Sequence, residues 1–421
     1  MEWFNKIKGV EWNFLFQRFS AVLTDKFVGI ISNIFLARLT SPENFGMIIL
    51  IYSVADVVFS VFDFGLGGSS SIEFSKNKLS KRKLLLSSVK YKFLSIPFVF
   101  FLSWMVSFFL NQQINVWIVF LIIFSEGLNT IIQLYFGLYY SNNDFKKLLL
   151  NTVISRSIQI ILYIIVILLF PNYYLIFCAI LLQYSLSLYL CHDYTVKLNL
   201  TENSDEFSLY KLMNEYRFLG INRIFNSFNS RVDNFVISQL LNLRELALYG
   251  VSMIFFRNFG LLSNSMATIY LPKYGMAMEK NNKREIFYES LIASFCVGLV
   301  SAIIVFFISG FAVKSLWGED YIDSVILIKI FAVGIPFLFV RTTAGYFLNF
   351  LGKTKINLIL SFFSFVVSIL LNMILIPFYG LIISAAIAVL IPLINSIIML
   401  YIISNLNTVL QISSIPDKGE K

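Results

Sequence analysis

Long apolar segments follow one another along almost the whole chain. Each has about 20 residues or more, which is the length that a helix needs to cross the roughly 30 Å hydrocarbon core of a bilayer. The pattern predicts twelve membrane-spanning helices at residues 14–39, 45–66, 91–110, 114–139, 148–170, 173–194, 213–241, 246–271, 286–313, 325–349, 356–378 and 381–403. Nearly every other residue falls in a short connector, which leaves no room for a soluble catalytic domain. We therefore expect an all-α integral membrane protein.

Polar side chains inside these segments fall on single helical faces, because residues three, four or seven apart lie on one side of a helix. The stripes are Arg18, Asp25 and Ser32 in the first helix; Ser53, Asp56, Ser60 and Asp63 in the second; Glu126, Asn129 and Gln133 in the fourth; Asn222, Asn226, Asn229 and Asp233 in the seventh; and Arg257 and Asn264 in the eighth. We expect them to line a hydrated interior while the Phe- and Ile-rich faces contact lipid. The Ser and Asn stripes could instead join helices to one another.

Charges near the middle of a membrane helix point to a cavity or a partner, because burying one there costs roughly 3 kcal/mol or more. The mid-segment charges are Asp25, Lys26, Asp56, Glu126, Arg231, Asp233, Arg257 and Arg341. Arginine favours oxyanions through paired, charge-assisted hydrogen bonds. The cations Lys26, Arg223, Arg231 and Arg257 therefore predict an anionic cargo, for which a phosphate group is the common candidate.

Several of these charges have a structural alternative. The neighbours Asp25 and Lys26, or Arg231 and Asp233, could form bridges between helices. Three further cations lie nearer segment ends, where a long side chain reaches the interface: Arg18, Arg156 and Lys329. Arg257 lies mid-segment with no carboxylate nearby in the sequence, so it is the best single cargo-binding candidate.

Composition agrees with a membrane protein. Hydrophobic residues make up 58% of the chain and charged residues 14%, against about a quarter charged in soluble domains. The net charge of +9 comes mainly from alternate connectors, above all the cluster Lys76, Lys78, Lys81, Arg82, Lys83, Lys90 and Lys92. This positive-inside bias places both termini in the cytoplasm. The basic charge therefore reports topology and an attraction to anionic lipid headgroups, and nucleic acid is not an expected partner.

The cysteines and the histidine suggest no metal or catalytic chemistry. Cys178, Cys191 and Cys296 all lie in apolar segments, and the single histidine, His192, lies near a segment end. We expect no disulfide, no metal site, no cofactor and no nucleophile–base pair. The N-terminus also lacks the pattern of a cleavable signal peptide.

The two halves of the chain resemble each other. Pro171 and Pro377 end the fifth and eleventh helices and lie 206 residues apart (377 − 171), as do Asn151 and Asn357 near the starts of those helices. The first helix carries Asp25-Lys-Phe-Val and the seventh carries Asp233-Asn-Phe-Val at a similar offset. We expect two parallel six-helix bundles, residues 1–205 and 206–421, around a central cavity, which is a known transporter plan.

Four motifs resemble those of Wzx-type polysaccharide and O-antigen flippases, members of the multidrug/oligosaccharidyl-lipid/polysaccharide exporter superfamily. They are Ala37-Arg-Leu-Thr-Ser-Pro-Glu-Asn-Phe-Gly46, Asp63-Phe-Gly-Leu-Gly67, Asn229-Ser-Arg-Val-Asp233 with Tyr249-Gly250, and Leu375-Ile-Pro-Phe-Tyr-Gly380 with Ala385-Ala-Ile-Ala388. They are spread in the expected order over nearly the full length.

The resemblance implies a MATE-like exporter fold and translocation of an undecaprenyl-diphosphate-linked oligosaccharide across the bacterial plasma (inner) membrane by alternating access. The product would be O-antigen, as in lipopolysaccharide, or capsule. Basic residues in the first, seventh and eighth helices would bind the cargo, and the matching positions are Arg18 or Lys26, Arg223 or Arg231, and Arg257. The carboxylates Asp25, Asp56, Glu126 and Asp233 could couple transport to protons or sodium, and Asp25 and Glu126 are additions to the family pattern. Membrane lipids and other polysaccharide assembly proteins are further expected partners.

Two other functions stay open from the sequence. A drug or cation antiporter of the same superfamily would share the fold and use Asp25, Asp56 or Asp233 as an ion site, although the intramembrane cations would repel positively charged drugs. A membrane polysaccharide polymerase or glycosyltransferase would need a large outer loop or an acidic motif in the first outer loop, and that loop offers only Glu43.

Overall fold

A computed structural model describes residues 12–76, 81–109, 115–198, 208–280 and 283–412. Their secondary structure is helical. The helices of the first part are α2 (Trp12–Leu39), α3 (Pro42–Asp63), α4 (Leu66–Lys76), α5 (Lys81–Phe109), α6 (Val116–Ser141), α7 (Phe145–Leu169), α8 (Tyr173–Lys197), α9 (Leu209–Glu215) and α10 (Arg217–Leu240). They continue with α11 (Leu243–Lys280), α12 (Lys283–Ala312), η1 (Val313–Trp317), η2 (Glu319–Tyr321), α13 (Ser324–Phe350) and α14 (Thr354–Ile412).

All twelve predicted segments coincide with helices. Ten helices in the described residues are long and apolar enough to cross a membrane. α10 is not among those ten, because its polar stripe lowers its mean hydropathy. α14 contains two of the predicted segments, separated by Gly380 with φ 62° and ψ −149°, a conformation open to glycine and strained for other residues. Adding α10 and counting α14 twice gives the predicted twelve.

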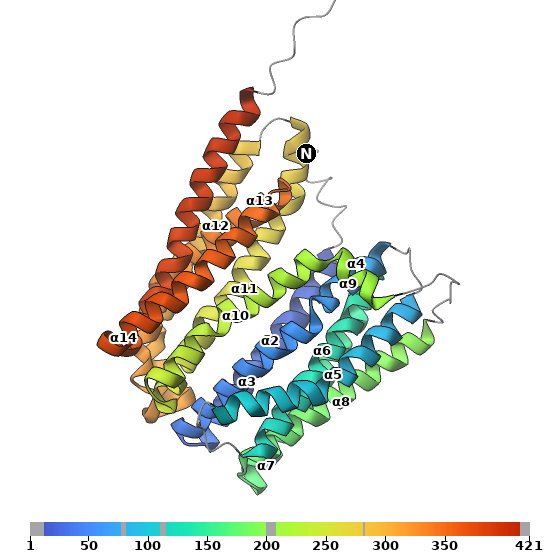
Figure 1. The fold of residues 1–421 in the computed structure, drawn as a ribbon, viewed down its shortest axis with the longest axis vertical. Helices are drawn as coiled ribbons and strands as arrows, with labels where there is room; N and C mark the ends of the chain where they lie inside the picture. Colours follow the sequence, from blue (N-terminus) through green and yellow to red (C-terminus); the bar gives the residue numbers. More distant parts are fainter. Residues whose placement is uncertain (1–11, 77–80, 110–114, 199–207, 281–282, 413–421) are drawn as a thin grey trace, which may run out of the picture. The chain divides into compact units, whose positions relative to one another are not determined.

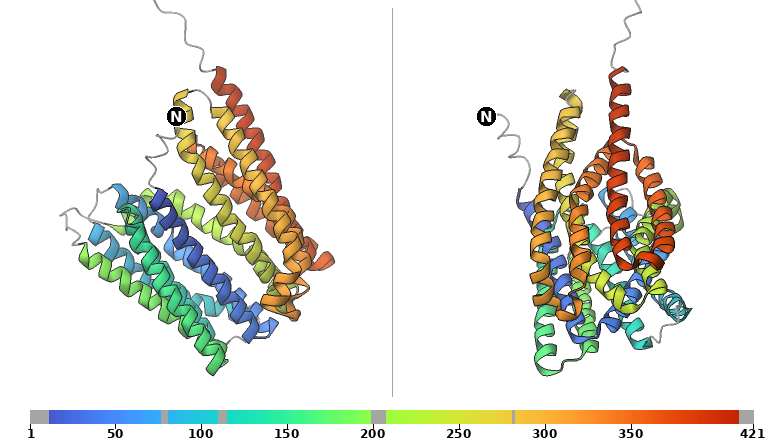
Figure 2. Two further views of the ribbon diagram at one scale, coloured as in Figure 1. Left: turned by 180° about the vertical axis from the view of Figure 1, so that it is seen from behind. Right: turned by 90° about the vertical axis from the view of Figure 1, so that its left-hand side faces the viewer.

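The chain divides into two compact units, Met1–Arg231 and Val232–Lys421, so the division falls inside α10. The division after residue 205 expected from the sequence stays a prediction. In unit 1, α3, α5 and α6 pack on one another, α2 packs on α7, and α8 packs on α6 and α7 (Figures 1 and 2). In unit 2, α11, α12 and α13 pack on one another, and α14 packs on α13.

The internal repeat extends to this packing. The mutually packed helices α3, α5 and α6 of unit 1 correspond in order to α11, α12 and α13 of unit 2. The second helix of each half also starts with a side-chain cap. Ser41 accepts a hydrogen bond from the Asn44 backbone N–H at 3.3 Å, and Asn242 accepts one from the Glu245 backbone N–H at 2.8 Å. Such caps satisfy N–H groups that have no partner inside the helix.

The Asp63-Phe-Gly-Leu-Gly motif forms a sharp corner between α3 and α4. Phe64 (φ 42°) and Gly65 (φ 74°) both adopt the left-handed conformation there. Gly220 in α10 packs directly on this corner, since a Cβ atom added to it would lie 2.6 Å from the carbonyl oxygen of Phe64. The motif therefore turns the chain and lets the first turn of α10 approach the corner closely.

Large apolar side chains point outward from the helices. Phe98 on α5 is 63% exposed, and Phe307 on α12 and Phe378 on α14 are each 78% exposed. Many similar residues accompany them on the same helices, whereas soluble proteins expose only small contiguous apolar patches. Together with the number of apolar helices, this surface identifies a multi-pass membrane protein.

Candidate functional site

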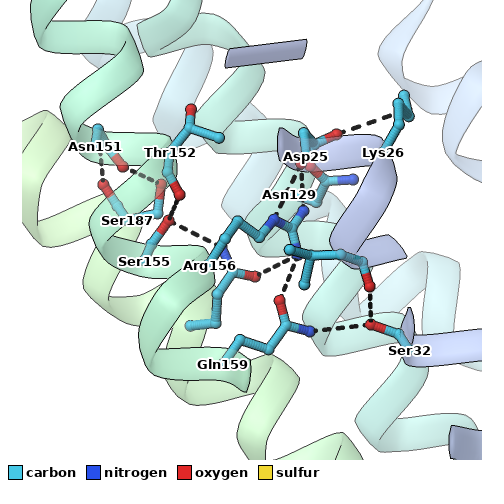
Figure 3. A network of polar contacts seen from close by, with 12 residues as sticks. Asp25, Lys26, Ser32, Asn129, Asn151, Thr152, Ser155, Arg156, Gln159 and Ser187 are labelled. Carbon is cyan, nitrogen blue, oxygen red and sulfur yellow. Dashed lines mark hydrogen bonds and ion pairs between the residues drawn. The ribbon is translucent and has the colours of Figure 1, made fainter. Parts of the chain in front are cut away.

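A buried ion pair joins α2 and α7 in unit 1 (Figure 3). The Arg156 guanidinium donates from Nε to Asp25 Oδ1 at 3.1 Å, and Nη2 donates to the same oxygen. Arg156 is 8% exposed. The prediction that Arg156 reaches the membrane interface is therefore wrong, because a carboxylate on the packed neighbouring helix holds its charge inside the unit.

The remaining donor of Arg156 extends the pair into a network. Nη1 donates to Gln159 at 2.7 Å and to Gln183 on α8 at 3.2 Å. The Gln159 amide then reaches Ser32 at 3.3 Å, and the Tyr163 hydroxyl donates to Ser32 at 2.8 Å. The network therefore links α2, α7 and α8, and we call Asp25, Ser32, Arg156, Gln159, Tyr163 and Gln183 the unit 1 clamp.

Lys26 is the second cation beside Asp25. Its Nζ lies 3.6 Å from Asp25 Oδ2, with side-chain exposures of 48% for the lysine and 37% for the aspartate. The anticipated Asp25–Lys26 pair thus exists, but Arg156 makes the closer and more buried contacts. Asp25 accordingly faces two cations.

A second ion pair joins α10 to α3. Arg231 Nε lies 3.0 Å from Asp56 Oδ2, and Ser227 donates to the Asp56 carbonyl oxygen at 3.2 Å. Arg231 thus forms a bridge between helices, as the structural alternative anticipated, but its partner is Asp56 and not its sequence neighbour Asp233. Side chains two positions apart point to different sides of a helix, so the sequence neighbour was the less suitable partner.

Two other predicted charges are engaged inside unit 1. Glu126 on α6 accepts from Asn129 at 3.2 Å and lies within electrostatic range of Asp56, Arg231 and Arg156. Lys92 had been placed in a connector, but it lies in α5, is 4% exposed and contacts Asp63 at 2.5 Å. Burial and pairing remove Lys92 from the cytoplasmic charge cluster.

In unit 2, Asp233 is held by neutral donors. Its carboxylate accepts from the Tyr249 hydroxyl on α11 at 2.8 Å, from Ser368 on α14 at 3.1 Å and from the Asn372 amide at 3.0 Å. The charge of Arg257 on α11 acts on the same carboxylate. Asp233 is 8% exposed, so these contacts replace the water that a carboxylate otherwise requires.

The repeated aspartates occupy matching places. Asp25 lies on the first helix of the first half and is bound by Arg156 on the fifth. Asp233 lies on the first helix of the second half and is bound by Ser368 and Asn372 on the first part of α14, the fifth helix of that half. The repeat thus preserves the position of the carboxylate, while its partner on the fifth helix changes from a cation to neutral side chains.

Arg341 in α13 differs from the paired arginines Arg156 and Arg231. It is half-buried and makes no hydrogen bond or ion pair with any residue that the structure describes. On its helix it shares a face with Gly334 and Gly345, which approach Val389 and Asn357 of α14. The sequence pointed to Arg341 as a mid-segment charge, but only the structure distinguishes it, because a missing partner cannot be seen in a sequence.

The other predicted binding residues are less constrained. Arg223 and Asn226 are exposed on α10, Asn222 and Asn229 are half-buried there, and Arg257 is half-buried on α11. Arg223 makes no polar contact with any described residue. Arg18 lies in α2, but its side chain lies outside the described residues.

Comparison with known proteins gives a family match and a relative that cover most of the chain. Residues 35–326 match the model of a family described as "Polysaccharide biosynthesis protein". A curated relative is the capsular polysaccharide biosynthesis protein CapF of Staphylococcus aureus, 22% identical over 359 residues, covering 82% of this chain and 87% of the relative.

Solved structures of transporters share the fold. An inward-facing MATE family multidrug resistance transporter of the MOP superfamily superposes with a TM-score of 0.73 at 12% identity, covering 93% of this chain and 96% of its own. The lipid II flippase MurJ in an inward closed conformation gives 0.72 at 15% identity, covering 91% and 86%. These findings confirm the resemblance to this superfamily and the expected fold class. The chain belongs to the polysaccharide biosynthesis protein family and has the all-α fold of MATE-like membrane exporters.

Proposed function

We propose that this protein is a flippase that moves an undecaprenyl-diphosphate-linked oligosaccharide from the inner to the outer leaflet of the bacterial plasma membrane. The family match and the name of the staphylococcal relative support a role in polysaccharide assembly. The likeness to exporters supports movement across the membrane as the step carried out. The chain would act without catalysing a covalent step.

The charge imbalance inside unit 2 is the observation that carries the proposal. The described mid-helix charges of this unit are two arginines, Arg257 and Arg341, and one carboxylate, Asp233. Arg341 has no partner among the described residues. An unpaired cation inside a membrane protein is costly, and such a residue therefore points to a functional site. A diphosphate supplies the missing negative charge and matches the guanidinium geometry. Arg257 and Arg341 are therefore the residues that we assign to the diphosphate.

Unit 1 would contribute differently. Arg156 and Arg231 are already paired with Asp25 and Asp56, so in this unit Lys26, Arg223 and Arg18 are the better candidates for contact with the cargo. Transport would proceed by alternating access of the two halves, with the polyprenyl chain remaining in the bilayer. Both termini would lie in the cytoplasm.

The driving force would involve the carboxylates. Asp233 accepts hydrogen bonds from three neutral side chains, Tyr249, Ser368 and Asn372, so it is a suitable group to exchange a proton or hold sodium. Asp25 and Asp56 would have to release an arginine first, and Glu126 has Asn129 as its donor. Asp233 and Glu126 are thus the preferred coupling residues.

Deletion of the gene in its host tests the proposal. We expect surface polysaccharide to disappear while complete lipid-linked units accumulate inside the cell. Complementation with wild type should restore the polymer, and complementation with Arg257→Gln should not, at equal protein level in the membrane. Single units that still reach the surface would indicate a polymerase. Normal polysaccharide with altered drug or ion tolerance would indicate an antiporter.

A further inference from the structure

A pocket of about 250 Å³ opens between α5, α6 and α8 in unit 1. The first turn of α5 and the last turns of α8 form its sides. These helix ends carry the lysine-rich connectors, so they lie at the cytoplasmic face by the positive-inside pattern. The clamp residues and the unit 2 arginines take no part in this pocket, and nothing in the proposed transport step uses it.

The polar lining of the pocket suits an anionic headgroup. Arg82 and His192 are both exposed side chains in the lining, and Thr195 completes it. The Thr195 hydroxyl donates to the His192 carbonyl at 2.8 Å, so its oxygen is left as an acceptor. Arginine offers a planar set of N–H donors that matches a phosphate. A headgroup with a phosphate and a free hydroxyl would therefore find both kinds of partner.

The rest of the lining is apolar and partly open to the side. Leu86 is 53% exposed and Val196 is 58% exposed, while Leu85 and Tyr135 form the buried floor. The volume is somewhat below the roughly 300–1,000 Å³ of sites that enclose a whole small molecule. It fits a headgroup and part of the glycerol backbone, while acyl chains would extend over Leu86 and Val196 into the bilayer.

The surrounding charges favour an anion. The cations at these helix ends are Lys81, Arg82, Lys83, Lys146, Lys147 and Lys197. Two carboxylates, Asp144 and Asp193, lie among them, and each contacts a lysine. Asp193 is paired with Lys197 at 2.6 Å, and Asp144 contacts Lys147 at 3.8 Å and accepts from the Tyr194 hydroxyl. Basic pockets between membrane helices at this face bind anionic lipid headgroups.

We propose that the α5–α6–α8 pocket is a binding site for an anionic phospholipid of the inner leaflet, with Arg82 on the phosphate, His192 as a second donor and Thr195 as an acceptor for a headgroup hydroxyl. This site is independent of the transported cargo. It ties the ends of three helices of unit 1 to the lipid around them.

Native mass spectrometry of the purified full chain with added phosphatidylglycerol or phosphatidylcholine tests this site. We expect the wild type to retain phosphatidylglycerol preferentially. Arg82→Gln should weaken that retention about fivefold, the effect of removing one basic contact near an anionic surface. Leu86→Trp should weaken it without changing charge, because the larger ring fills the open side of the pocket. Lys353→Gln, which changes an exposed lysine of unit 2, is the matched control and should bind as wild type.

Three results of the lipid-binding measurements would overturn the proposal. The first is equal retention of the two lipids by the wild type. The second is unchanged phosphatidylglycerol binding in both Arg82→Gln and Leu86→Trp. The third is a loss in Lys353→Gln as large as in Arg82→Gln, which would indicate general charge attraction. Competition by glycerol phosphate without acyl chains separates the sources of the anion. If glycerol phosphate displaces phosphatidylglycerol fully at the concentration used for the lipid, the pocket binds phosphate without needing acyl chains. That result would contradict a lipid site.

Discussion

The unit 1 clamp allows a quantitative prediction. Replacing Arg156 by methionine keeps the volume and removes contacts to Asp25, Gln159 and Gln183. Removing one partner of a buried ion pair costs about 3–5 kcal/mol, because the remaining charge stays buried without compensation. The Asp25 side chain is 37% exposed and keeps Lys26 at 3.6 Å, which lowers that penalty. We therefore expect Arg156→Met to lower the free energy of unfolding by about 3 kcal/mol, at the bottom of this range.

A double-mutant cycle isolates the Arg156–Asp25 interaction itself. Polar contacts inside membrane proteins couple by about 0.6 kcal/mol on average and about 1.7 kcal/mol at most. A charged pair with two hydrogen bonds to one oxygen belongs at the upper end, so we expect about 1.5 kcal/mol between Arg156→Met and Asp25→Asn. The measurement is equilibrium unfolding in mixed micelles with increasing dodecyl sulfate. Arg223→Met, at an exposed arginine without polar contacts in the described chain, is the control and should change stability by less than about 0.5 kcal/mol.

Two outcomes would refute this reasoning. Arg156→Met as stable as the control variant would show that the guanidinium is not buried and paired. Additive effects of the two substitutions, with coupling near zero, would show that Arg156 and Asp25 do not interact. In either case Arg156 would become a cargo-binding candidate.

Three further variants test the roles assigned to two arginines and the close packing of Gly220. Arg257→Gln should abolish polysaccharide export at normal membrane abundance, as measured by complementation of the deletion strain; retained export would remove Arg257 from the site. Arg341→Leu should also impair export but raise the free energy of unfolding by about 1 kcal/mol or more, because an unpaired membrane charge is lost. A lower free energy of unfolding would show instead that Arg341 makes a stabilising contact. Gly220→Leu should destabilise unit 1 by about 1–3 kcal/mol through overpacking against the Phe64 corner, and wild-type stability in the same unfolding assay would contradict that close approach.

The helices could be predicted from the sequence because one rule governs them all. A bilayer requires about 20 apolar residues and internally satisfied backbone groups, so every predicted segment falls on a helix. The polar α10 could also be recognised, through its stripe rather than its hydropathy. The two helices within α14 also agree with the sequence, since the non-helical conformation of Gly380 lies between the two predicted segments.

The charged partners were predicted less well. Arg231 could be tied to Asp233 by closeness in sequence, yet its partner is Asp56, 175 residues away. Arg156 looked like an interface residue because it lies near a segment end, and Lys92 looked like a connector residue for the same reason. In each case the deciding factor is which helices pack together, and no local pattern in a single sequence contains that information. The repeat came closest, since Asp25 and Asp233 occupy matching helices and both contact the fifth helix of their half.

The central claim is transport of a diphosphate-linked lipid through cationic side chains, and proteoliposomes test it most directly. Vesicles would contain the full chain and a polyprenyl-diphosphate oligosaccharide, with translocation followed by access of the sugar to an impermeant lectin. The account predicts that wild-type vesicles expose all of the sugar with time, whereas vesicles with Arg257→Gln combined with Arg341→Leu expose only the half present outside at the start. Two results would contradict it. One is equal translocation of the substrate by the wild type and by this double variant. The other is that the wild type translocates a lipid without the diphosphate as well as it translocates the diphosphate-linked lipid.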